Sequence, residues 1–217
     1  MNKSDKIEII ISYIIFLVAG LFHVLHLFTK QIDVLFSPLF VIIFIWIIIK
    51  EMMHTDEAKG YSIYFFIGYF LSFLISLILF RNSQFDYNFH FGTVLKPQLF
   101  SVPLIAGFIW VSAIFTSTAL IQRLSIFERQ NIFVKSIMIG VTFLVFDIYL
   151  EPAAGRLGFW SWGGTSIPVV NYFVWLIYGS VMSYIGLKMK ILNEKLSPVA
   201  MNLYIAQIIY FLVVFIS

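Results

Sequence analysis

The chain has 217 residues, of which 61% are hydrophobic and only 12% are charged, and its mean hydropathy is +0.96. Soluble domains are usually about a quarter charged. The composition therefore excludes a soluble globular protein and predicts an all-α, polytopic membrane helix bundle that forms a single domain over residues 1–217. The net charge of +3 gives no reason to expect a nucleic-acid partner, because lysines in a membrane protein usually set its topology.

Long apolar runs predict about seven transmembrane helices, since one span needs about 20 predominantly apolar residues. The first run lacks a small-residue cleavage pattern, so we expect it to be retained as a span. The second run is short and contains Pro38. In chain order, the predicted spans are residues 9–28, 34–49, 61–80, 100–121, 132–150, 167–187 and 199–216.

Lysine and arginine are divided unequally between the two sides of such a bundle. Of the 14 residues of these types, ten lie at the N-terminus and in the connections after spans 2, 4 and 6, and four lie in the other connections. The positive-inside rule then places the N-terminus in the cytoplasm and the C-terminus outside. We expect a multi-pass protein of the bacterial plasma membrane.

The stretch from Asp147 to Trp175 carries charges and tryptophans at the edge of the membrane, on the predicted outer side. Asp147 and Glu151 lie four residues apart and share one helix face if the helix holds to Pro152. We expect that helix to end there, because proline fits poorly in a helix interior and the glycines that follow favour a tight re-entrant turn.

The two carboxylates are the strongest candidates for catalysis. A carboxylate inside a span costs roughly 2.5–3.5 kcal/mol on insertion scales, so such a residue usually faces the bundle interior and is often functional. A pair of carboxylates in different surroundings supplies an acid and a base for proton transfer. The alternative is a structural tie between Asp147 and Arg156 or a loop backbone.

Aromatic side chains gather near the carboxylates. Both the connection over residues 81–99 and the loop that carries Trp160 and Trp162 are rich in aromatic residues, and Trp110 and Trp175 are expected at a similar depth in spans 4 and 6. We predict a cavity with aromatic walls, suited to a long apolar ligand whose reactive end meets polar groups near the interface. The alternative for these tryptophans is an interfacial belt.

The histidines give a weaker signal. His23 and His26 lie three residues apart near the outer end of span 1, and His90 lies in the connection over residues 81–99. A catalytic zinc usually has three protein ligands, and the chain has four histidines in all, so we expect no metal. His90 is a candidate for joining the site from its loop.

Two blocks of sequence carry a family pattern. The first consists of Phe91-Gly92, Leu95, Pro97, Val102-Pro103-Leu104 and Trp110. The second consists of Asp147, Glu151-Pro152, Gly158, Trp160, Trp162, Pro168, Asn171 and Trp175. With these blocks, over roughly residues 85–178, the chain resembles the carotenoid biosynthesis family of bacterial and archaeal carotenoid 1,2-hydratases, which includes bisanhydrobacterioruberin hydratase.

This resemblance implies addition of water across the terminal C1–C2 double bond of an acyclic or monocyclic, lycopene-like carotenoid. Protonation at C2 gives a tertiary cation at C1, which water then captures. The reaction needs no redox cofactor, and we expect no cofactor at all. The expected partners are the carotenoid, water and membrane lipid.

Within this scheme we expect Asp147 to be the general acid and Glu151 to position or deprotonate the water, although the two roles are open to exchange. Trp160 and Trp162 are expected to face the cation. Arg156 is expected to hold Glu151 ionised. The candidates for binding water or substrate further include Asn171, His90, His23, His26, Trp110 and Trp175.

Two other functions fit the same residues. A carotenoid end-group cyclase also begins by protonating a polyene, but it excludes water from the cation. A non-enzymatic carotenoid or lipid carrier would bind the pigment without converting it. Analysis of the product distinguishes the cyclase from the hydratase, because a cyclase adds no oxygen. Loss of function in Asp147→Asn distinguishes the hydratase from a carrier, which would keep its function.

Overall fold

The structure is a computed structural model that describes residues 3–27, 29–53, 58–81, 89–163 and 166–217. Within these residues the chain is predominantly helical, which confirms the predicted all-α fold. The helices are α1 (Lys3–Val24), α2 (Thr29–Met52), α3 (Ala58–Arg81), α4 (Ile105–Ile121), α5 (Ser125–Glu128), α6 (Ile132–Arg156), α7 (Val169–Lys188) and α8 (Pro198–Ile216). Four strands of two residues each complete the described elements: β1 (His90–Phe91), β2 (Gln98–Leu99), β3 (Val102–Pro103) and β4 (Trp160–Ser161).

Each of the seven predicted spans overlaps one long helix, α1 to α4 and α6 to α8, with bounds that differ by up to six residues. By length and composition, α1, α3, α6, α7 and α8 could each cross a membrane, and several such helices make this a membrane protein. Helix α4 is apolar but has only 17 residues. It lies in the middle of the bundle, where almost all of its side chains are buried against its neighbours.

The predicted start of span 4 at residue 100 is wrong by five residues. A short hairpin precedes α4, in which Leu99 pairs with Val102 and Gln98 with Pro103. Its two turn residues, Phe100 and Ser101, have positive φ angles of 52° and 66°, which suits the twist of a two-residue hairpin turn and is incompatible with a right-handed helix.

The expected end of the fifth span at Pro152 is also wrong, because α6 continues to Arg156. Proline removes only one backbone donor, and membrane helices tolerate such a loss where the surroundings compensate for it. The chain turns after Leu157, whose backbone N–H still donates to Ala153 O at 2.9 Å. Glu151 therefore lies more than a turn before the end of α6 and is held in a regular helix.

Helices α6 and α7 form the most extensive helix contact in the bundle. Small residues allow them to approach closely: a Cβ atom on Gly140 would lie 2.1 Å from Ser180 Oγ, and one on Gly179 would lie 2.6 Å from Phe143 Cδ1. This packing brings the first turn of α7, with Asn171, against the last turns of α6.

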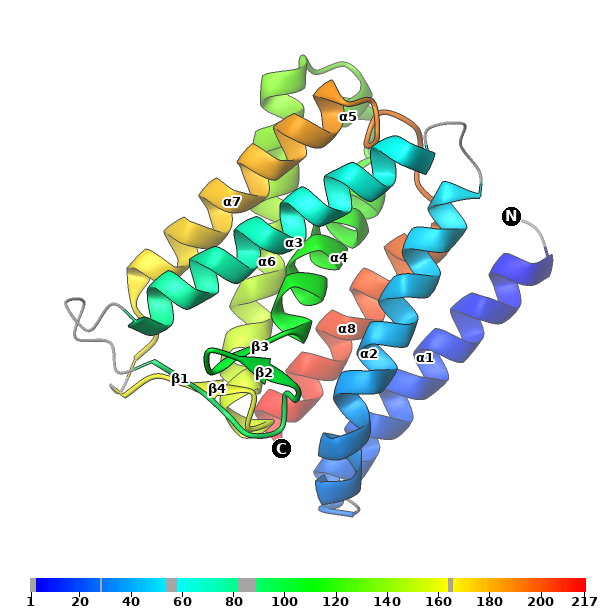
Figure 1. Cartoon of the computed structure of the whole chain (residues 1–217). Coiled ribbons are helices and arrows are strands. Elements are labelled where there is room, and N and C mark those ends of the chain that lie inside the picture. Colours follow the sequence, from blue (N-terminus) through cyan, green and yellow to red (C-terminus); the bar gives the residue numbers. More distant parts are fainter. Residues whose placement is uncertain (1–2, 28, 54–57, 82–88, 164–165) are drawn as a thin grey trace.

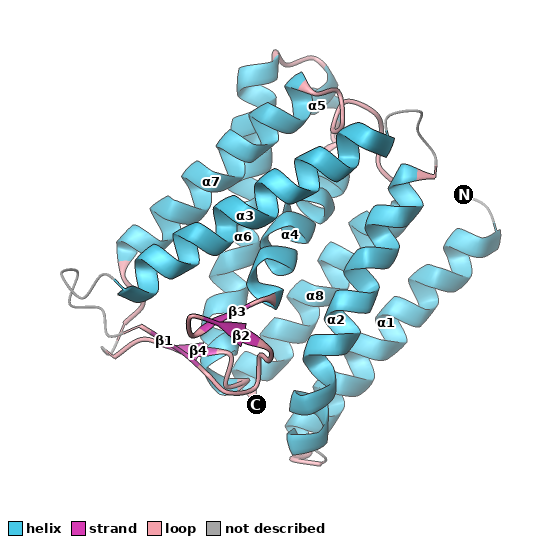
Figure 2. Ribbon diagram, viewed as in Figure 1, coloured by secondary structure: helices cyan, strands magenta, loops and turns pink. Residues whose placement is uncertain are grey.

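The four strands lie at the opposite end of the bundle from the connections α4–α6 and α7–α8 (Figures 1 and 2). There β1 pairs with β4, so that Phe91 lies opposite Trp160. Gly92 makes the contact possible, because its N–H donates to Phe159 O at 2.8 Å and a Cβ atom would lie 1.8 Å from Gly158 O. The pairing joins the two aromatic loops into one layer over the ends of α3, α4, α6 and α7.

Candidate active site

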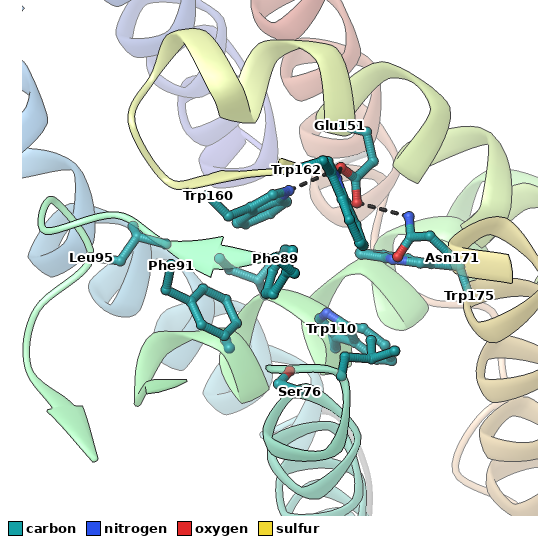
Figure 3. A pocket seen from close by; sticks show the side chains of 13 residues that line it. Ser76, Phe89, Phe91, Leu95, Trp110, Glu151, Trp160, Trp162, Asn171 and Trp175 are labelled. Atoms are coloured by element: carbon teal, nitrogen blue, oxygen red, sulfur yellow. Dashed lines mark hydrogen bonds between the residues drawn. The ribbon is translucent and has the colours of Figure 1, made fainter. Parts of the chain in front are cut away.

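Glu151 is the centre of a buried hydrogen-bond network. Its Oε2 atom accepts hydrogen bonds from Trp160 Nε1 and Trp162 Nε1, both at 2.9 Å, and its Oε1 atom accepts one from Asn171 Nδ2 at 2.8 Å (Figure 3). Its residue exposure is only 5%. These three neutral N–H donors occupy three of the about four lone-pair positions of the carboxyl group, which stabilises its ionised form and leaves one position on Oε1 for a proton.

Asp147 lies one helical turn before Glu151 and is completely buried. Its Oδ2 atom is 3.2 Å from Asn171 Nδ2, so the same amide nitrogen contacts both carboxyl groups. Its Oδ1 atom has no hydrogen-bond partner within the described residues. Burying a carboxylate oxygen without a hydrogen-bond partner costs free energy when the carboxyl group is ionised. A proton on the carboxyl group or a bound water molecule lowers this cost.

A cavity of about 30 Å³ lies beside Glu151. Glu151 and Asn171 are its polar residues on α6 and α7, and Asp147 does not line it. Its aromatic walls come from α4, α7 and the paired loops and consist of Trp110, Trp175, Trp160, Trp162, Phe89 and Phe91. The volume is sufficient for one or two water molecules.

The aromatic rings around the cavity support one another. Trp110 and Trp175 have ring centroids 4.6 Å apart, and Phe89 lies at the same distance from Trp162. These rings present an apolar and polarisable wall opposite the Glu151 carboxylate. Such faces stabilise a nearby cation by roughly 0.5–2 kcal/mol.

Comparison with protein families gives a match over residues 36–217 to the family described as carotenoid biosynthesis protein. This chain belongs to that family. The match gives it a role in carotenoid biosynthesis and implies a carotenoid substrate. Comparisons with curated proteins and with solved structures give no match.

The part of the chain that matches the carotenoid biosynthesis family includes every residue that lines the cavity. It leaves out the whole of α1, which carries His23. The ring of His23 lies 6.1 Å from that of Tyr210 on α8, and exposed His26 follows α1 with a positive φ of 52°. Neither histidine lines the cavity, so the structure separates them from the carboxylates.

His90 is also outside the cavity, although its neighbours Phe89 and Phe91 line it. Side chains alternate across a strand, and in β1 this places His90 on the exposed side. The expectation that His90 binds water at the site is therefore not supported by its position. Among the described residues, no group of three or more His, Asp or Glu side chains could hold a metal ion.

Arg156 does not contact Glu151, which corrects the expectation of an ion pair. Its Nη1 atom lies 3.5 Å from Val214 O, and its guanidinium group lies 5.6 Å from the centre of the Phe215 ring. Five residues along a helix correspond to a rotation of about 140° away from the first side chain, so Arg156 leaves α6 on another face. The contacts of Glu151 come from indole and amide groups instead of a cation.

Ser76 on α3 lines the cavity and was absent from the sequence prediction. It is buried, with 5% exposure, and lies on the side of the cavity that Trp110 also lines (Figure 3). A single serine within an apolar span forms no motif, and its orientation toward α4 and α7 depends on tertiary packing. Its polarity inside the span predicted over residues 61–80 was the one available signal.

Proposed function

We propose that this protein is a carotenoid 1,2-hydratase that adds water across the terminal C1–C2 double bond of an acyclic carotenoid end group. The observation that carries the proposal is the buried pair of Asp147 and Glu151, of which Glu151 faces a small cavity with aromatic walls. An acid, a wall for a carbocation and a site for one water molecule are the parts that this reaction requires.

The carboxyl pair acts as one unit that holds one proton. Asp147 and Glu151 contact the same amide nitrogen, and no ion pair with a cation is found for either of them among the described residues. Two adjacent buried carboxylates without a counter-ion do not both ionise, because each disfavours the charge of the other. A proton is therefore available at the cavity.

Glu151 is the group of the pair that touches the substrate, because it lines the cavity and Asp147 does not. It transfers the proton of the pair to C2, and the electrons of the double bond form the new C–H bond, which leaves a cation at C1. The N–H groups of Trp160, Trp162 and Asn171 stabilise the carboxylate that remains. Asp147 acts through Glu151 and is a positioning residue.

A water molecule in the cavity then attacks C1 and returns a proton to Glu151, which restores the pair. The oxygen of this water becomes the new hydroxyl group, and no electrons leave the system. Trp110, Trp175 and Phe89 close the other sides and protect the cation from a second nucleophile. This assignment gives Glu151 both the acid and the base role, whereas the sequence prediction divided these roles between Asp147 and Glu151.

The polar residues of the cavity favour hydration over cyclisation. Glu151, Asn171 and Ser76 provide places for water, whereas a cyclase must keep water away from its cation. Expression in a lycopene-producing bacterium, followed by mass spectrometry of the pigments, tests the proposal. A hydratase adds one water per reacted end, a cyclase changes no mass, and a carrier leaves the pigment unconverted.

We also propose that the site lies at the outer face of the bacterial plasma membrane, with the N-terminus in the cytoplasm. Ten of the 14 lysine and arginine residues lie on the predicted cytoplasmic side. The strands lie at the other end of the bundle, next to the C-terminus (Figure 1), and Phe91 of β1 and Trp160 of β4 line the cavity. Water from the outer surface has the shorter path to Glu151 in this orientation.

A further inference from the structure

A second hollow lies on the surface of the bundle, between α3 and α7. It is an apolar groove of about 480 Å³, lined from α3 by Leu71, Ile75, Ile78 and Leu79 and from α7 by residues between Val170 and Met182. Figure 1 shows the two helices side by side. Helix α7 packs mainly against α6 and only weakly against α3, which explains why the seam between α3 and α7 remains open.

The groove and the Glu151 cavity are the two sides of this seam. Leu79 lines both. On the same helices, Ile75, Val170 and Val174 line the groove, while their neighbours Ser76, Asn171 and Trp175 line the cavity. Successive residues of a helix point about 100° apart, so neighbouring residues of α3 and α7 can line different spaces. Leu79 lies between the cavity and the groove, and its displacement would connect them.

Two hydrogen bonds between α3 and α7 close the end of the groove that lies away from Leu79. The Tyr178 hydroxyl donates to Gly68 O at 2.7 Å, and the Tyr64 hydroxyl donates to Met182 O at 3.1 Å. These two bonds tie α3 to α7 and keep the remainder of the seam shut. From Val170 to Met182, the groove follows α7 for about 18 Å, at 1.5 Å per residue.

We propose that the α3–α7 groove is the lateral opening of the site and holds the polyene chain of the carotenoid while the end group passes Leu79 to reach Glu151. This inference rests on the proposed function and adds the route and seat of the substrate. A polyene has no hydrogen-bonding groups, and the one polar side-chain group on the groove wall, the Tyr178 hydroxyl, is already bonded. Ile78, Ile177 and Val181 are exposed and would face lipid, from which such a molecule comes.

The small volume of the cavity agrees with this arrangement. About 30 Å³ accommodates water but not the polyene, and the end group can enter only when Leu79 turns aside. The bulk of the substrate therefore needs another seat, and the adjacent groove is much larger. Half-buried Leu79 is the side chain that turns aside when the end group enters.

A matched pair of variants tests the groove. Ile75→Trp fills it, and Ile15→Trp makes the same change in a separate apolar groove of about 330 Å³ between α1 and α2, which shares no residue with the Glu151 cavity. Both isoleucines are half-buried. Val174→Trp fills the same groove from α7 and replaces Ile75→Trp if that variant accumulates poorly. Turnover is measured with lycopene and with a short terpene such as myrcene, and carotene that co-purifies with the protein is measured by absorbance.

We expect Ile75→Trp to lower both lycopene turnover and the amount of bound carotene about tenfold or more. A tenfold loss corresponds to about 1.4 kcal/mol, which is a typical cost of placing a larger side chain in a filled space. Myrcene hydration persists in Ile75→Trp, and Ile15→Trp behaves as the wild type. Unchanged bound carotene in both groove variants would overturn the proposal and leave the groove as a lipid contact. If the wild type binds carotene without hydrating it, and Ile75→Trp loses that binding, the hydratase function fails while the groove assignment stands.

Discussion

The side-chain amide of Asn171 donates to Glu151 Oε1 at 2.8 Å and so joins the first turn of α7 to the buried end of α6. The same nitrogen lies 3.2 Å from Asp147 Oδ2. This contact links the two carboxyl groups, which the proposed mechanism treats as one unit. It depends on the close approach of α6 and α7 at Gly140 and Gly179.

Removing the acidity of either carboxyl group should abolish most of the activity. We expect Glu151→Gln and Asp147→Asn each to reduce turnover about 100-fold or more at unchanged protein abundance, as for general acid–base groups. Pigment conversion and protein abundance are measured in the same membranes. Near-normal conversion in Asp147→Asn would show that Asp147 has only a structural role, and the same result in Glu151→Gln would remove the proposed acid.

The indole N–H groups should matter separately from the rings. Trp160→Phe and Trp162→Phe each remove one hydrogen bond to Glu151 and retain an aromatic wall. A hydrogen bond to a charged group contributes about 1.5–3 kcal/mol, so we expect roughly a 10- to 100-fold loss of turnover. Trp175→Phe is the control, because Trp175 lines the cavity and donates no hydrogen bond to Glu151. Equal losses in all three variants would contradict the role of the N–H groups.

The pairing of the two loops predicts an effect of Gly92. In Gly92→Ala the new Cβ atom would lie 1.8 Å from Gly158 O, a backbone atom that cannot turn aside. We expect a destabilisation of about 1–3 kcal/mol together with loss of activity. In Gly155→Ala the nearest atom to the new Cβ is Trp160 O at 4.0 Å, so this variant should behave as the wild type. Thermal unfolding of the purified variants measures the difference, and a stable, active Gly92→Ala would contradict the loop contact.

The proposed orientation predicts the location of both ends of the chain. A reporter fused after Ser217 should lie in the periplasm, and one inserted near Arg129 should lie in the cytoplasm, because the lysine and arginine bias favours this topology. Paired fusions to alkaline phosphatase and a fluorescent protein give the readout. A cytoplasmic reporter after Ser217 would show that the chain crosses the membrane an even number of times.

Helical spacing was enough to predict the core of the candidate site. Asp147 and Glu151 share one face of α6 because they lie four residues apart, and the family pattern pointed to Asn171 and the tryptophans. The same rule places Arg156 on another face of α6, once the helix is known to continue past Pro152. Local preference for a helix end at proline was overridden by packing within the bundle.

The remaining features depend on contacts between distant segments. Ser76 reaches the cavity only because α3 packs against α4 near α7, and the exposed position of His90 follows from the pairing of β1 with β4. No periodicity or composition in either segment encodes its partner. The three-residue spacing of His23 and His26 made them weaker candidates for the site, but α1 packs against α8 and contributes no residue to the cavity.

The origin of the new hydroxyl oxygen tests the central claim most directly. Cells that carry lycopene and this protein are grown in water enriched in oxygen-18, with and without air, and the pigments are analysed by mass spectrometry. Hydration through the Asp147–Glu151 pair predicts that the hydroxyl oxygen carries the label from water in both conditions and that the label is lost with Glu151→Gln. A hydroxyl oxygen that comes from molecular oxygen, or a product with a ring and no added oxygen, would contradict the account.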